Sequence, residues 1–160
     1  MTTKSNKALV IGAGFAGLSA ASFLAKKGWD VTIVEKNEMA GGRARKFEAE
    51  GFTFDMGPSW YWMPDVFEKY FGSFGKKVSD FYELQRLDPS YRVYFEKATW
   101  DLPANYEALK NLFESIEPGA GNALDLFLAE AKYKYEVGVG KLVYQPSLSI
   151  TEFIDFELIK

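Results

Sequence analysis

Three glycines near the start of the chain have a spacing that can bind phosphate. Gly12, Gly14 and Gly17 lie in the run VIGAGFAGLSA. In such a G-x-G-x-x-G pattern the first glycine permits a tight turn, the second lets the backbone approach a pyrophosphate, and the third lets a helix pack closely on a strand. We expect the N–H groups of Phe15 and Ala16, at the start of that helix, to point at the phosphates. The pattern alone predicts only a nucleotide.

An acidic residue follows where a ribose-binding carboxylate is expected. Glu35 comes directly after a β-branched run at residues 31–34. A carboxylate accepts hydrogen bonds from both ribose hydroxyls and repels a 2′-phosphate, so Glu35 disfavours NADP and leaves FAD and NAD as candidates. Lys36, otherwise a solvated surface lysine, would offset part of that repulsion.

A second glycine-containing loop supplies a guanidinium shortly after this acid. Gly41 and Gly42 are two permissive backbone positions before Arg43. The planar donors of an arginine can bind phosphate oxygens or the adenosine. Such a tripeptide alone is more often a plain loop, but coupled to the glycine pattern and Glu35 it is predicted to belong to the nucleotide site.

The elements around these residues form a strand, a helix and a strand. Residues 7–11 are largely apolar and end in glycine, which is typical of a buried strand in a parallel sheet. Residues 15–27 have apolar side chains at helical spacing, and Gly28 is the stop signal. With the strand at 31–34 they predict a βαβ unit with a right-handed crossover. The predicted fold class is therefore α/β, with a Rossmann-like unit and a parallel sheet.

The rest of the chain predicts hairpins and helices in a mixed α+β arrangement. A capping-box pattern at residues 149–152 opens one further helix, which has no stop signal before Lys160. We expect a nucleotide-binding domain over residues 1–90 and a truncated substrate domain over residues 91–160. The other expected elements are hairpins at residues 47–56 and 91–102, helices at 65–71 and 105–116, a loop at 117–122, and a helix from Ala123 into the 130s that Gly138 and Gly140 weaken.

Composition excludes several kinds of chemistry. The 160 residues include no Cys and no His, which excludes disulfides, histidine triads and ordinary zinc sites within this sequence, and we expect no metal. The net charge of −3 and the absence of a basic block argue against nucleic acid. No apolar run is long enough for a signal peptide or a bilayer span, so a cytoplasmic location is expected. Aromatic residues reach 17%, which predicts either a core or the wall of an apolar ligand site.

The stretch from residue 12 to residue 64 resembles a known family. It joins the glycine turn, the acid at Glu35 and the Gly-Gly-Arg loop to an aromatic-Asp-x-Gly segment, FDMG, at residues 54–57. In this combination it is similar to the N-terminal region of the FAD-dependent amine-oxidase and carotenoid-desaturase superfamily. The continuation, PS at 58–59 and the aromatic-rich run at 65–95, is most similar to the bacterial phytoene desaturases.

The resemblance implies FAD and a desaturation in carotenoid biosynthesis, in which the flavin accepts a hydride from an apolar isoprenoid such as phytoene. It implies no particular catalytic acid or base. Family members are several times longer and complete the FAD site with a second glycine motif, which nothing after residue 121 supplies, so we expect an N-terminal fragment. The resemblance places the ADP part of FAD on Gly12, Gly14, Gly17, Glu35, Gly42 and Arg43, and it places Met56, Gly57, Pro58 and Ser59 near the flavin.

Two alternatives remain open. Another flavin oxidoreductase of the superfamily, such as an amine oxidase or a retinol saturase-like reductase, would share residues 12–57. A non-catalytic relative would bind a nucleotide without the flavin. Because a phytoene-type substrate dissolves in the bilayer, we expect peripheral attachment to the inner face of the cell membrane. The sequence does not predict the oligomeric state.

Overall fold

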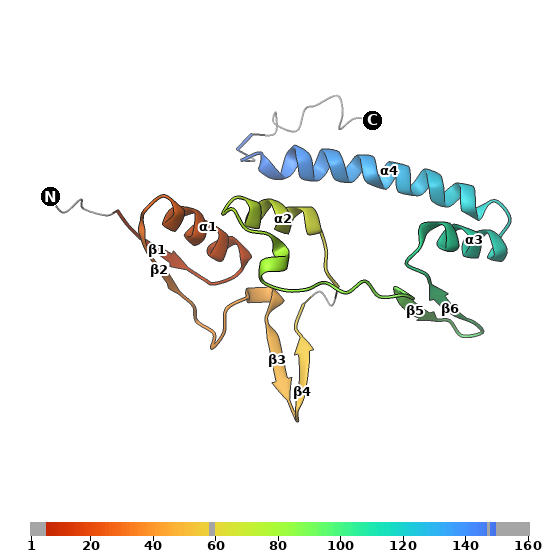
Figure 1. The fold of residues 1–160 in the computed structure, drawn as a ribbon, viewed down its shortest axis with the longest axis horizontal. Helices are drawn as coiled ribbons and strands as arrows, with labels where there is room; N and C mark the ends of the chain where they lie inside the picture. Colours follow the sequence, from red (N-terminus) through yellow and green to blue (C-terminus); the bar gives the residue numbers. More distant parts are fainter. Residues whose placement is uncertain (1–5, 58–59, 147, 150–160) are drawn as a thin grey trace. The chain divides into compact units, whose positions relative to one another are not determined.

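The protein consists of two compact units. The structure, a computed structural model, describes residues 6–57, 60–146 and 148–149 (Figure 1). Contacts within the chain divide it into Met1–Leu84 and Gln85–Lys160. The division of roles that we expect, cofactor binding in residues 1–90 and substrate binding in residues 91–160, remains a prediction.

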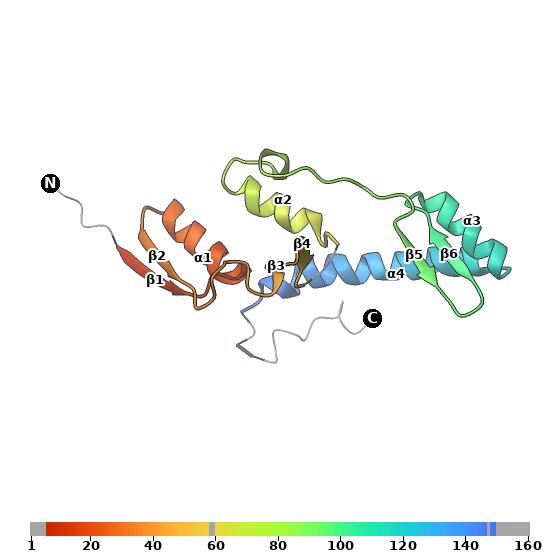
Figure 2. The ribbon, with the colours of Figure 1, turned by 90° about the horizontal axis from the view of Figure 1, so that it is seen from below.

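The first unit begins with the expected strand, helix and strand. Strand β1 (Lys7–Ile11) and strand β2 (Asp30–Val34) pair in parallel, in a register that sets Lys7 beside Asp30 and Ile11 beside Val34. Helix α1 (Phe15–Lys26) connects them and packs against both strands (Figures 1 and 2). The helix ends where Gly28 takes a positive φ of 82°. The predicted βαβ unit with a parallel strand pair is confirmed.

A second helix packs beside α1 through aromatic side chains. Helix α2 (Pro64–Gly72) brings Tyr70 to within 6.1 Å of Phe23, measured between ring centroids, in an edge-to-face arrangement. The hydroxyl of Tyr70 donates to the hydroxyl oxygen of Ser22 at 2.9 Å. These contacts join two helices that are far apart in the sequence. The helix predicted at residues 65–71 is confirmed, with Pro64 as its first residue.

An aromatic hairpin follows the βαβ unit in the sequence. Strands β3 (Lys46–Ala49) and β4 (Phe52–Asp55) pair antiparallel, and the turn at Glu50 and Gly51 has positive φ angles of 52° and 82°. The rings of Phe47 and Phe54 stack at 5.2 Å, while 67% of Phe52 is exposed. Among the described apolar residues only Ala13, Ala21, Val78 and Leu102 are buried. The aromatic residues therefore do not form a buried core in the part of the chain that the structure describes.

The second unit contains a hairpin and two helices. Strands β5 (Tyr91–Tyr94) and β6 (Thr99–Leu102) pair antiparallel, as predicted. Helix α3 (Tyr106–Ile116) starts after Asn105, whose side-chain oxygen accepts a hydrogen bond from the N–H of Ala108 at 3.0 Å. Helix α3 packs on helix α4 (Ala120–Gly140).

Three short 3₁₀ turns were not predicted from the sequence. They are η1 (Gly42–Ala44) and η2 (Val78–Asp80) in the first unit and η3 (Leu142–Tyr144) in the second.

Helix α4 differs from its prediction at both ends. It begins at Ala120, inside the predicted loop at 117–122, because Glu114 of the preceding helix accepts hydrogen bonds from the N–H groups of Gly119 and Gly121, each at 2.9 Å. At its other end it continues to Gly140, since about 1 kcal/mol per glycine does not interrupt a helix of this length. No helix in the described part of the chain is both long and apolar enough to cross a membrane. The capping box predicted at 149–152 lies outside the described residues.

Replacing Glu114 by alanine is expected to lower the thermal unfolding midpoint at neutral pH by several degrees. The N–H groups of Gly119 and Gly121 hold the pKa of the Glu114 carboxyl below its usual value. A lowered folded-state pKa stabilises the fold above the unfolded pKa, and that stabilisation is lost as the pH falls through the folded value. The midpoints of the two proteins should therefore converge in acid. Glu117→Ala, which removes an exposed acid in the same turn, is the control, and equal shifts for both variants would contradict the cap.

Candidate nucleotide-binding site

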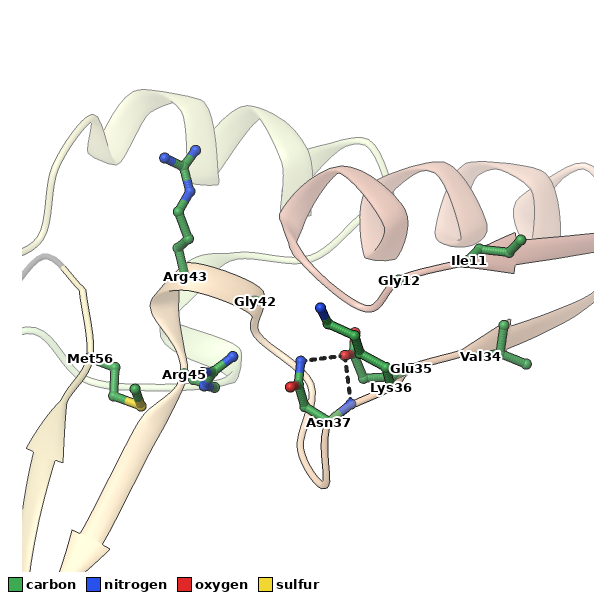
Figure 3. A pocket seen from close by; sticks show the side chains of 10 residues that line it. All are labelled: Ile11, Gly12, Val34, Glu35, Lys36, Asn37, Gly42, Arg43, Arg45 and Met56. Carbon is green, nitrogen blue, oxygen red and sulfur yellow. Dashed lines mark hydrogen bonds between the residues drawn. The ribbon is translucent and has the colours of Figure 1, made fainter.

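A pocket of about 780 Å³ opens at the carboxyl ends of the two parallel strands (Figure 3). This edge is where open α/β sheets bind their ligands. Its walls come from the end of β1, the residues after β2, and the turn η1 with its flanks. The lining residues are Ile11, Gly12, Val34, Glu35, Lys36, Asn37, Gly42, Arg43, Arg45 and Met56.

Glu35 is fixed in the wall of this pocket by hydrogen bonds to both carboxylate oxygens. Oε2 accepts from the backbone N–H of Ala13 at 2.7 Å. Oε1 accepts from the backbone N–H of Asn37 at 2.9 Å and from its side-chain amide at 2.6 Å (Figure 3). The N–H of Ala13, followed by that of Asn37, holds the pKa of Glu35 below its usual value. The side chain is thus an oriented anion, and Oε2 keeps a lone pair that a ligand hydroxyl can use.

The glycine turn packs α1 tightly on the end of β1. A Cβ on Gly17 would overlap the carbonyl oxygen of Gly12 and would lie 3.1 Å from its carbonyl carbon. The close packing predicted for Gly17 is therefore confirmed. Gly14 is the N-cap of α1 and has no side chain, so it provides no capping acceptor for the N–H groups of the first turn. That the N–H groups of Phe15 and Ala16 bind phosphate remains a prediction.

The second glycine loop lies directly against the first. The N–H of Gly41 donates to the carbonyl oxygen of Ala13 at 2.8 Å. A Cβ on Gly42 would lie 3.1 Å from the Cα of Gly14. The structure thus brings together two glycine loops that the sequence analysis assigned to one site without a contact between them.

The comparisons with known proteins agree with this geometry. A sequence family described as an NAD(P)-binding Rossmann-like domain matches residues 10–76. The carotenoid 3,4-desaturase of Haloarcula japonica is 46% identical over 151 residues, which is 94% of this chain and 30% of that protein. The 4,4′-diapophytoene desaturase (4,4′-diaponeurosporene-forming) of Staphylococcus aureus is 43% identical over 132 residues, which is 82% of this chain and 26% of that protein. The chain belongs to the carotenoid desaturase family.

The chain spans less than a third of the length of these relatives. Among solved structures, a CLA-producing fatty acid isomerase from P. acnes is 31% identical, with a TM-score of 0.36, and the match covers 49% of this chain and 19% of that one.

The predicted site residues fall into three groups. Gly12, Glu35, Lys36, Gly42, Arg43 and Met56 line the pocket, whereas Gly14, Phe15, Ala16 and Gly17 form the adjoining turn and helix start. Gly57 packs against the same loop, because a Cβ there would overlap the carbonyl oxygen of Arg43. Pro58 and Ser59 lie outside the described residues. Which of these residues bind a cofactor remains a prediction.

The sequence did not indicate that Ala13, Asn37 and Arg45 belong to the site. Ala13 acts through its backbone, which residue type does not reveal. Asn37 follows the acid by two positions. The only sequence signal for its amide is the general tendency of short polar side chains to form hydrogen bonds with nearby groups. Arg45 had a clearer signal, as the second arginine of the run GGRAR.

Proposed function

We propose that this chain forms the FAD-binding part of a desaturase that oxidises an apolar isoprenoid of the phytoene type. The observation that carries the proposal is the anchored, ionised Glu35 at the carboxyl ends of β1 and β2, beside the glycine turn. Family membership supports the redox class, since the relatives are named as carotenoid and diapophytoene desaturases.

The residues of the site fit the ADP half of FAD. The approach of Gly42 to Gly14 forms a cradle that a Cβ would fill, which suits a backbone that must come close to a diphosphate. Glu35 would hold the ribose hydroxyls and would exclude a 2′-phosphate. The N–H groups of Phe15 and Ala16 would bind the diphosphate, and Lys36 and Arg43 would contribute positive charge. Met56 and Gly57 would lie on the flavin side of the site, as would Pro58 and Ser59.

FAD, when bound, accepts a hydride from an allylic carbon. The described residues would orient the cofactor and keep its ribose in place, and we assign no proton transfer to any of them. A long hydrocarbon has no polar group for recognition, so apolar area has to select it. The exposed aromatic residues, such as Trp60 at 67% exposure, support an apolar partner. We place the start of the substrate-binding domain in residues 91–160.

The protein at its full natural length, produced in a phytoene-accumulating bacterium, should convert phytoene into a coloured polyene. Product absorption and chromatography measure the conversion, and the purified protein should show flavin absorption. A flavin spectrum without polyene formation would indicate another flavin oxidoreductase, such as an amine oxidase or a retinol saturase-like reductase. A colourless protein that binds a nucleotide would indicate a non-catalytic relative. Either result would overturn the proposal.

We also propose that the whole protein works at the cytoplasmic face of the cell membrane. The reason is its proposed substrate, which dissolves in the bilayer. Sedimentation with phytoene-containing liposomes tests this location, and a protein that stays in the supernatant with and without phytoene would contradict it.

A further inference from the structure

Three cationic side chains line the pocket, and one of them differs from the others. Lys36 and Arg43 are exposed to solvent, whereas Arg45 is half-buried. Among the described residues, the guanidinium of Arg45 has no hydrogen bond or ion pair. Partial burial removes water from a cation and makes the lack of a partner unfavourable. A guanidinium held in this way in a pocket wall is suited to a ligand.

The backbone of Arg45 contacts the second glycine loop at Gly41 and the segment after β4 at Met56. Gly41 donates to the carbonyl oxygen of Ala13, and with its positive φ of 115° it approaches Arg45 so closely that a Cβ on Gly41 would lie 3.2 Å from the Cα of Arg45. The carbonyl oxygen of Arg45 accepts the N–H of Met56 at 2.9 Å. Arg45 is thus positioned by the same turn that sets the second glycine loop against the first.

The side chains of the two arginines extend to different sides. Figure 3 shows Arg43 extending away from Glu35, whereas Arg45 lies on the side of the pocket where Asn37 is found. The start of α1, where the proposed diphosphate would lie, does not line this pocket. Arg45 lines the same pocket as Glu35, and the ribose that Glu35 would hold carries the base.

We propose that Arg45 is a specificity-determining contact for the adenine base of the dinucleotide. The assignment rests on the nucleotide site proposed above. A guanidinium is planar, stacks on aromatic rings and donates hydrogen bonds in its own plane, so it can recognise a purine by its face or its ring nitrogens. Because the contact is to the base, it distinguishes nucleotides that share the same ribose diphosphate.

The test compares ADP with UDP, which differ only in the base. Titration calorimetry on this chain should show that Arg45→Ala lowers the affinity for ADP about tenfold and changes the affinity for UDP little, so that the preference for ADP is lost. Arg45→Lys keeps the charge without the plane and should resemble the alanine variant. Lys46→Ala removes the neighbouring exposed cation, which pairs with Glu48 at 2.5 Å, and serves as the control. Circular dichroism spectra verify that the variants fold.

Three outcomes would overturn the assignment in distinguishable ways. A parallel loss of ADP and UDP affinity would place Arg45 on the ribose or phosphates. If Arg45→Ala bound ADP with the same affinity as Lys46→Ala, Arg45 would not contact the nucleotide. If the unsubstituted chain bound neither nucleotide, the proposed nucleotide site itself would fail, and the assignment with it.

Discussion

Replacing Gly17 by alanine is expected to abolish nucleotide binding and to destabilise the first unit by about 3 kcal/mol or more. The new Cβ would overlap the carbonyl oxygen of Gly12. That turn cannot easily move, since the N–H of Gly12 donates to the carbonyl oxygen of Val34 at 2.7 Å. Alanine gains about 1 kcal/mol over glycine inside a helix, which is smaller than the cost of the clash.

Urea unfolding followed by circular dichroism measures the loss of stability, and calorimetry with ADP measures the loss of binding. The matched control is Gly72→Ala in α2, where the Cβ would meet nothing within 4 Å and φ is not positive. That variant should be neutral or slightly more stable. A Gly17→Ala protein that unfolds and binds like the control would show that α1 does not need to lie so close to the turn.

Replacing Glu35 by glutamine is expected to lower the affinity for ADP by about tenfold. It should also reduce the preference for ADP over a nucleotide that carries a 2′-phosphate. An amide has one oxygen for the donors of Ala13 and Asn37, which now share two carboxylate oxygens. The variant also removes the negative charge while Lys36 and Arg45 stay in the pocket wall. Affinities for ADP and for adenosine 2′,5′-bisphosphate, measured by calorimetry, give the discrimination as a ratio.

Glu38→Gln is the matched control, because it removes an exposed acid three positions further along without changing the pocket wall. It should leave both affinities unchanged. If the Glu35→Gln protein kept the preference for ADP, the carboxylate would not be what excludes the 2′-phosphate.

The pH dependence of ADP binding tests the ionised state of Glu35. Because hydrogen bonds from Ala13 and Asn37 lower its pKa below the usual value of 4.5, the carboxylate stays charged at pH values where an ordinary glutamate begins to protonate. The contribution of Glu35 to ADP binding should be constant above that value and should fall only as the pH drops through the lowered pKa. In the Glu35→Gln protein this step should be missing.

Much of the local structure followed from the sequence. The βαβ unit, the turn at Glu50 and Gly51 and the helix at Asn105 depend on signals between near neighbours, namely apolar periodicity, glycines with positive φ and a capping side chain. The candidate site also followed in part, because a dinucleotide site needs glycines and an acid at a fixed spacing. The start of α4 could not be predicted from local sequence signals, because its capping side chain is Glu114, a residue of the preceding helix.

The sequence by itself determined the local parts of the candidate site: a glycine turn, an acid directly after the second strand and a second glycine loop, beside a parallel strand pair. Only the tertiary structure decided how these parts meet. It fixed Glu35 to Ala13, set Gly42 against Gly14, and placed Arg45 in the pocket wall while Arg43 extends away. The physical reason is that spacing along the chain specifies backbone conformation locally, whereas contacts between distant segments depend on packing and on backbone groups that every residue type shares.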